Sequence, residues 1–147
     1  MTERLTAEQI AEARGVRILH GTLAGGLAVI LGLFSLVVRR LSGPLLRTDE
    51  TMGTIAWALA GVALLDLALA LLFFRSRLAP PVRSGPPEAY WKPETRASAL
   101  LLWILFEGGG MIACVGYVLT GHSAPLAAAA IALLMLIWHS PGRLAGG

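Results

Sequence analysis

Residues 97–120 read ASALLLWILFEGGGMIACVGYVLT, an apolar run in which Glu107 is the only charged side chain. A helix of about 20 apolar residues crosses the ~30 Å hydrocarbon layer of a bilayer, so this stretch predicts a transmembrane helix. Three further apolar runs cover residues 16–38, 52–74 and, more briefly, 125–138. None of them alternates with the period of two that transmembrane strands require. The sequence therefore predicts an all-α protein with four transmembrane helices arranged as two hairpins.

The composition of the whole chain agrees with this prediction. Of 147 residues, 56% are hydrophobic and 14% charged, and the mean hydropathy is +0.71, which excludes a disordered, collagen-like or disulfide-stapled chain. The single cysteine, Cys114, lies inside an apolar run away from basic or metal-ligating residues, so we expect a buried, inert side chain. The net charge of +3 comes from basic residues that flank the apolar runs, so we expect no nucleic-acid partner.

The positions of the Lys and Arg residues predict the orientation in the membrane. Nine of the 12 fall in the N-terminal segment, the central loop and the C-terminal tail, which the positive-inside tendency places in the cytoplasm. The other three, Arg39, Arg40 and Arg47, lie on the opposite side. We expect a multi-pass protein of the inner (cytoplasmic) membrane with an N-terminal segment (1–15), a first hairpin (16–74), a Pro-rich cytoplasmic linker (75–96), a second hairpin (97–140) and a C-terminal tail (141–147).

Capping signals predict where two of the helices begin. Thr6 and Gln9 are the first and last residues of a capping-box pattern, so a helix should start near Thr6. This helix should enter the first apolar run either straight or with a bend at Gly15. The segment before this run contains acidic residues and no small-residue cleavage site, so we expect it to be retained rather than removed as a signal peptide. Pro93 and Glu94 suit the first turn of the third helix, where a missing N–H costs nothing and a carboxylate meets the helix dipole.

The linker between the two hairpins is rich in proline. Five of the 8 prolines lie between residues 80 and 93, so this segment should be extended and not helical. Its Tyr90 and Trp91 are expected at the lipid headgroups, where aromatic side chains gather. The alternative is that these two rings dock a partner protein.

Asp66 and Glu107 are the candidate proton- or ion-binding residues, because both lie deep inside apolar runs. A charged side chain at bilayer depth costs ~2.5 to 3.5 kcal/mol, so it normally is paired, is neutral or faces protein or water. Asp66 precedes Arg75 by nine residues and Glu107 follows Arg96 by eleven, which at ~1.5 Å per residue gives similar depths of ~13 and ~16 Å. Carboxyls that face one another would share a proton or a cation. Carboxyls that lie apart would each hydrogen-bond a neighbouring helix.

Two groups of glycines predict close contacts between helices. Three successive glycines after Glu107 cost ~0.8 to 1.0 kcal/mol each in a helix interior, so something must offset that cost. Close approach of another helix or subunit is one explanation, and a local opening that turns carbonyls toward an ion is the other. The first apolar run carries a GxxxG pair and one further glycine on a small-residue stripe. The candidate helix-packing residues are Gly21, Gly25, Gly32, Gly108, Gly109 and Gly110.

Metal, cofactor and catalytic signals are weak. His20 and His139 are expected near the cytoplasmic ends of their helices as solvated interfacial residues, and His122 is expected on the opposite side. Three ligands so placed do not make a metal site. The chain has no HExxH or GxSxG motif and no phosphate-binding loop after a strand. We therefore expect no metal, no cofactor and no enzymatic activity.

Residues 101–121, LLWILFEGGGMIACVGYVLTG, carry a resemblance. The leucine-rich stretch, the Glu-Gly step at Glu107 and the later Gly116-Tyr117 look like one helix of a group of small bacterial four-helix membrane proteins. The stretch also resembles the carboxylate helix of rotary-ATPase proteolipids (subunit c), which form rings and carry one proton or Na⁺ per buried carboxylate. Proteolipids usually have that carboxylate on the second helix of a hairpin, whereas Glu107 lies on the first helix of its hairpin.

Three functions follow from these observations. The first is a packing or accessory subunit of a membrane complex, whose partners are the lipid bilayer and other membrane subunits or a second copy of this chain. The alternative is a homo-oligomeric translocator that binds H⁺ or Na⁺ at Glu107 and Asp66. A third is a small drug exporter, which the four-helix size resembles, although the first apolar run here lacks the carboxylate that the small multidrug resistance family has there.

Overall fold

The computed structural model describes residues 6–41, 43–46, 50–81 and 86–146, and its regular elements are all helices. This confirms the all-α prediction. Four of the helices are long: α1 (Ala7–Leu36), which continues into a π-helical turn (Val37–Leu41), α2 (Glu50–Phe74), α3 (Pro93–Thr120) and α4 (Ser123–Trp138). Three short helices complete the described chain: two 3₁₀ turns (Arg75–Arg77 and Pro87–Tyr90) and α5 (Pro141–Ala145).

Three of these helical stretches, Ala7–Leu41, Thr51–Arg77 and Pro93–Thr120, are long and apolar enough to cross a membrane. The fourth, α4, is equally apolar but has only 16 residues. At ~1.5 Å per residue, α4 is ~24 Å long, shorter than the hydrocarbon layer. The unpaired backbone groups at its two ends therefore need hydrogen-bond partners within the protein.

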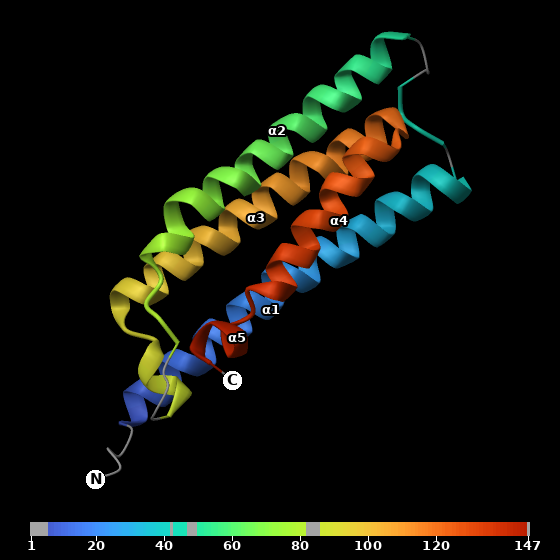
Figure 1. Cartoon of the computed structure of the whole chain (residues 1–147). Coiled ribbons are helices and arrows are strands. Elements are labelled where there is room, and N and C mark those ends of the chain that lie inside the picture. Colours follow the sequence, from blue (N-terminus) through green and yellow to red (C-terminus); the bar gives the residue numbers. More distant parts are fainter. Residues whose placement is uncertain (1–5, 42, 47–49, 82–85, 147) are drawn as a thin grey trace.

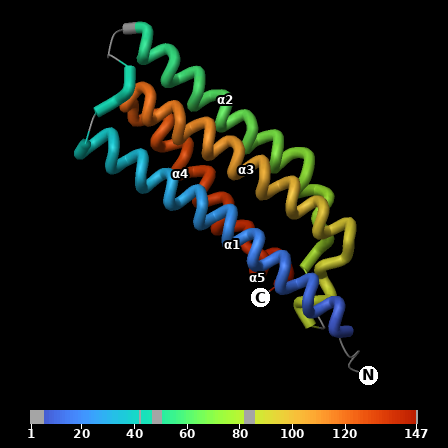
Figure 2. Tube along the Cα trace, turned by 180° about the vertical axis from the view of Figure 1, so that it is seen from behind, coloured from blue at the N-terminus to red at the C-terminus, as the bar shows by residue number. Residues whose placement is uncertain are grey.

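The long helices run up, down, up and down along one bundle, with α3 in the middle (Figure 1). Seen from behind, α1 and α2 lie on opposite sides of α3 (Figure 2). Both of these outer helices pack mainly on α3 and α4 and not on each other. The two helices of the predicted first hairpin thus follow one another in the sequence, but each packs mainly on the helices of the second hairpin. The start of α1 and the short helix α5 lie toward the same end of the bundle (Figure 1).

The predicted helix starts are confirmed. Thr6 Oγ1 accepts a hydrogen bond from Gln9 N (3.2 Å), and Thr6 N donates to Gln9 Oε1 (2.9 Å), which completes the capping box of α1. The helix then continues through Gly15 without interruption. Pro93 begins α3, and Glu94 lies in its first turn.

The end of α3 is capped by the loop between α1 and α2. Leu45 N and Leu46 N donate to the carbonyls of Val118 and Leu119, each at 3.0 Å. The helix stops at Gly121, whose φ of +66° favours glycine, and a Cβ there would lie 3.2 Å from Pro44 Cβ. Carbonyls that α3 leaves unpaired at its end are thus satisfied within the protein, as a low-water environment requires.

The linker differs from its prediction. Residues Pro87–Tyr90 form one 3₁₀ turn, because proline is tolerated at the first position of a helix. Tyr90 and Trp91 are only 3% and 4% exposed, so they belong to the core and do not face the lipid headgroups. Tyr90 donates its hydroxyl proton to the Ala79 carbonyl at 3.0 Å. The expectation of an extended, non-helical linker with outward aromatic rings was therefore wrong for residues 87–91.

Two ion pairs connect α1 with the chain around the start of α3. Arg17 contacts Glu88 at 3.2 Å, and Arg96 contacts Glu12 at 2.8 Å. All four side chains are at least a fifth exposed, so each pair contributes little free energy by itself. The Arg17–Glu88 pair joins the 3₁₀ turn to α1, and the Arg96–Glu12 pair joins the start of α3 to α1.

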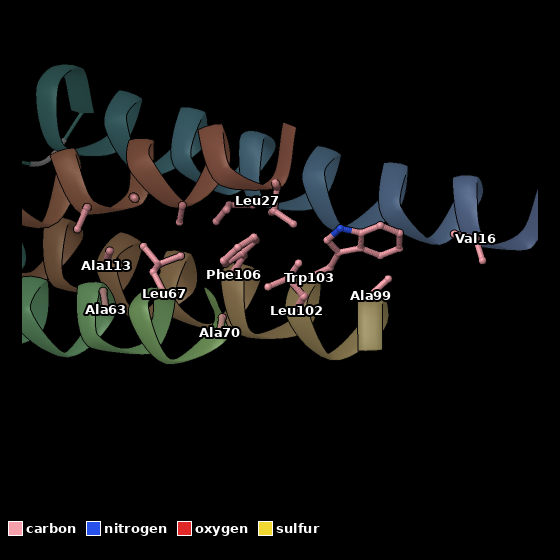
Figure 3. Close-up of a cluster of buried hydrophobic side chains, with 14 of the residues drawn as sticks. Val16, Leu27, Ala63, Leu67, Ala70, Ala99, Leu102, Trp103, Phe106 and Ala113 are labelled. Carbon is pink, nitrogen blue, oxygen red and sulfur yellow. The ribbon is translucent and has the colours of Figure 1, made fainter. Parts of the chain in front are cut away.

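The core is built from a few large side chains, most of them on α3, and from many alanines of α3 and its neighbours (Figure 3). Trp103, Phe106 and Leu102 of α3 and Leu27 of α1 are completely buried. The alanines, which allow the helix backbones to approach, include Ala63, Ala70, Ala99 and Ala113. Cys114 is also fully buried, as predicted.

Candidate functional site

The two membrane-depth carboxyls lie at the same level of the bundle. Asp66 of α2 sits against the glycines that follow Glu107: a Cβ on Gly109 would lie 3.4 Å from Asp66 Oδ2, and one on Gly108 would lie 3.6 Å from it. The same Cβ on Gly109 would lie 3.0 Å from the Ala63 carbonyl oxygen. The absence of side chains at these glycines therefore makes the room in which the Asp66 carboxyl lies.

Glu107 leaves α3 in another direction. Each residue of an α-helix is turned about 100° from the one before it, so Glu107 is turned about 200° from Gly109, which faces α2. Among the described residues, neither Asp66 nor Glu107 makes a hydrogen bond or an ion pair with the other or with any other group. Both side chains are partly exposed at the bundle surface. The structure thus gives Asp66 a defined niche between α2 and α3 and gives Glu107 none that involves Asp66.

The remaining glycines of α3 pack closely, and one that the sequence analysis did not select does the same. A Cβ on Gly110 would lie 2.6 Å from Leu27 Cδ2 and 3.1 Å from Ala132 Cβ. On Gly116 it would lie 3.1 Å from Leu59 Cβ. These glycines allow α3 to touch α1, α2 and α4 at once, which agrees with the packing explanation for the glycine run.

The glycines selected in α1 have different surroundings. A Cβ at Gly21, Gly25 or Gly32 would meet no atom of the described chain within 4 Å. All three residues are exposed, on the side of α1 opposite its buried residues Val16, His20 and Leu27. The small-residue stripe of α1 therefore faces away from this chain.

Three aromatic side chains satisfy the C-terminal end of α4. His20 Nε2 lies 2.9 Å from the Leu136 carbonyl, and His139 Nδ1 lies 2.9 Å from the Met135 carbonyl. Trp103 Nε1 donates to the His139 carbonyl at 2.8 Å, and its ring meets His20 edge-on at 4.8 Å. His20 thus supplies a donor to the Leu136 carbonyl near the helix end, and Trp103 supplies one to the His139 carbonyl just after it, whereas the Met135 carbonyl also accepts from the His139 backbone N–H at 3.0 Å. These contacts are the means by which a helix too short to span can end inside the bundle.

The two histidines were expected to be solvated, and that expectation was wrong. His20 is 8% exposed and His139 is 5% exposed. The cause is the early end of α4, whose last carbonyls lie among side chains and need donors from the protein. A predicted helix shorter than a span, with a histidine next to its end, was the available signal for this arrangement. His122 lies apart from them and caps the start of α4, accepting from Ala124 N at 3.2 Å.

A cavity of about 410 Å³ opens beside His139 at this end of the bundle. Among the described residues of its wall, the charged side chains are Arg75 and Arg143, and none is Asp or Glu. Burial lowers the pKa of His139, its hydrogen bond to the Met135 carbonyl opposes this, and the nearby Arg75 charge lowers it further. Burial also raises the pKa of Tyr90, so its hydroxyl stays neutral at pH 7. The other wall residues are Leu78, Ala79, Pro80, Pro81, Trp138 and Leu144.

Within the described ranges, no three His, Cys, Asp or Glu side chains lie close enough to hold a metal ion. Comparison of the chain with protein families, with curated proteins and with solved structures finds no match. The candidate sites are therefore three in number: the carboxyl niche of Asp66, the outward glycine stripe of α1 and the basic cavity near His139.

Proposed function

We propose that this chain is a four-span protein of the inner membrane, with cytoplasmic termini, that serves as a packing subunit of a membrane complex. In this proposal the chain has no catalytic role, and the outer face of α1 binds a transmembrane helix of a partner subunit. The observation that carries the proposal is the open glycine stripe of Gly21, Gly25 and Gly32. Without water to drive association, helices in a bilayer associate through close contact at such small residues.

The uneven burial of the helices supports the same proposal. In its most apolar 18-residue stretch, α3 has 50% of its residues buried and α2 has 28%, whereas α1 has 6%. Val29, an apolar side chain near the stripe, is 69% exposed, so this face of α1 is apolar and open. A second helix that packed on this face would gain van der Waals contact that α1 lacks within its own chain.

A leucine placed in the stripe tests the proposal. Gly25→Leu should leave the fold intact, because a Cβ at that position meets nothing within 4 Å. It should remove a partner polypeptide that native mass spectrometry finds at fixed stoichiometry after mild detergent extraction. Gly61→Leu is the matched control, because Gly61 is equally open on the exposed side of α2.

The outcomes separate clearly. Loss of the partner in Gly25→Leu alone would support docking on α1. Extraction as a free monomer, or equal effects of the two substitutions, would contradict it. A complex that contains only copies of this chain would mean that the helix bound to α1 comes from a second copy and not from a different subunit.

The second candidate function, binding of H⁺ or Na⁺ by Asp66 and Glu107 in a translocator, is favoured by the Asp66 niche. The Asp66 carboxyl lies in the space that side chains on Gly108 and Gly109 would reach, and it has no hydrogen-bond partner among the described residues. A carboxyl at that depth is stable when it carries a proton or a cation.

Under this function, Asp66→Asn should abolish Na⁺- or pH-sensitive labelling by a carboxyl-reactive carbodiimide and should stop transport in liposomes. Labelling and transport that match those of the unmodified chain would exclude it, and Glu107→Gln tests the other carboxyl in the same assay.

A further inference from the structure

We propose that the basic cavity near His139 binds the phosphate group of an anionic phospholipid, held between Arg75 and Arg143. The site is independent of the α1 stripe and of the membrane-depth carboxyls. It is built by residues from four parts of the chain: the 3₁₀ turn after α2, the linker, the end of α4 and α5.

The charges of the cavity favour an anion. Both of its charged wall residues are arginines, and neither forms an ion pair with a carboxylate in the described chain. Two arginines elsewhere at this end, Arg17 and Arg96, differ because each forms an ion pair with a glutamate. The Arg143 guanidinium lies 4.7 Å from the centre of the Trp138 ring, which holds the charge at the rim. Arginine matches a phosphate group through paired N–H donors.

The surroundings of the cavity favour a lipid as the carrier of that phosphate. Exposed apolar side chains continue from the cavity along α2 and α4, among them Phe73 (56%), Ile137 (51%) and Trp138 (64%). The cavity thus lies where the apolar surface of the bundle gives way to arginines, as at the headgroup level of a bilayer. A ligand with a phosphate head and acyl chains would cover both parts, whereas a soluble phosphate would use only the arginines.

His139 gives the cavity one further polar group. Its Nδ1 is engaged by the Met135 carbonyl, so its Nε2 is the nitrogen without a hydrogen bond among the described residues. The ring belongs to the cavity wall together with the Tyr90 hydroxyl, which already donates to Ala79. The anion is therefore held by the two arginines, with His139 beside them.

Native mass spectrometry of the full chain in neutral detergent tests this site. With phosphatidylglycerol and phosphatidylcholine supplied in equal amounts, the unmodified protein should retain phosphatidylglycerol preferentially. The double variant Arg75→Gln/Arg143→Gln should lose at least about tenfold of that preference, since each basic residue near an anionic lipid surface contributes about fivefold. Arg39→Gln/Arg40→Gln is the matched control, because it removes the same charge from the π-helical turn at the far end of α1.

Three results would overturn the proposal. Equal losses of the phosphatidylglycerol preference in the two double variants would mean that the preference depends only on the net charge of the protein. Displacement of the lipid by millimolar inorganic phosphate would make the site one for a soluble anion. Retention of the full preference by Arg75→Gln/Arg143→Gln, with an unchanged thermal unfolding midpoint, would show that the two arginines are not what holds the lipid.

Discussion

The glycines of α3 and those of α1 are the same residue in opposite surroundings. In α3, Gly109 and Gly110 lie against a carbonyl and a leucine of neighbouring helices, so close that a methyl group would collide. In α1, Gly21, Gly25 and Gly32 face open space. The comparison shows that a run of glycines in an apolar helix predicts a close contact but does not say whether the same chain provides it.

The largest effect that the comparison predicts is for valine at Gly110. Leu27 is fully buried and cannot swing away, and the Ala132 Cβ limits the other side at 3.1 Å, so Gly110→Val should lower the free energy of unfolding by about 3 kcal/mol. Gly32→Val should change it by less than about 0.5 kcal/mol, because no atom lies nearby. Unfolding by sodium dodecyl sulfate, followed by circular dichroism, measures both. Similar values for the two variants would remove the distinction between the helices.

A smaller effect is expected for alanine at Gly109. The added Cβ would lie 3.0 Å from the Ala63 carbonyl oxygen, and a backbone atom cannot rotate out of the way. The gain in helix propensity offsets part of this clash, so we expect a net loss of about 1 kcal/mol in the same unfolding assay. A gain in stability would mean that α2 and α3 can separate without cost at this point. The Asp66 niche would then be less rigid than the structure indicates.

Much of this architecture was predictable because its causes are local. The apolar runs, the capping box at Thr6 and Gln9, and Pro93 at the start of α3 each depend on a few neighbouring residues. The spatial order of the helices was not predictable, because nothing in residues 16–74 shows that α3 lies between the two helices of that segment. The inward positions of Tyr90 and Trp91 depend on the same long-range arrangement.

The candidate sites divide in the same way. Asp66 and Glu107 could be selected from the sequence, and their common depth agrees with the contact of Asp66 with Gly108. The direction in which each carboxyl points depends on how α2 and α3 are rotated, which the sequence does not encode locally. The basic cavity joins residues as far apart as Arg75 and Arg143, so only the folded chain shows it.

The buried end of α4 extends the comparison from glycines to polar groups, and it predicts a pH dependence. Because burial lowers the pKa of His139 in the folded protein, the unfolded chain binds more protons below about pH 6.5. The stability that the neutral ring contributes is present above pH 6.5 and is lost as the pH falls, by at most about 1.4 kcal/mol per pH unit for one proton. Unfolding in neutral detergent between pH 7.5 and 5 measures this slope. His139→Asn, whose amide can still donate toward Met135, should have a smaller slope, and an equal slope would assign the titration elsewhere.

The last predicted effect has opposite signs in two assays and therefore sharpens the comparison most. Gly25→Ala should raise the unfolding free energy of the isolated chain by up to about 1 kcal/mol, because alanine has a higher helix propensity than glycine and its methyl group would meet no other atom. The same methyl group would lie in the proposed contact between α1 and a partner helix, where small residues allow the backbones to approach. Assembly measured by native mass spectrometry should therefore weaken while the chain itself becomes more stable. Gains in both assays would mean that lipid covers the glycines of α1, since alanine costs nothing on a face that no helix approaches.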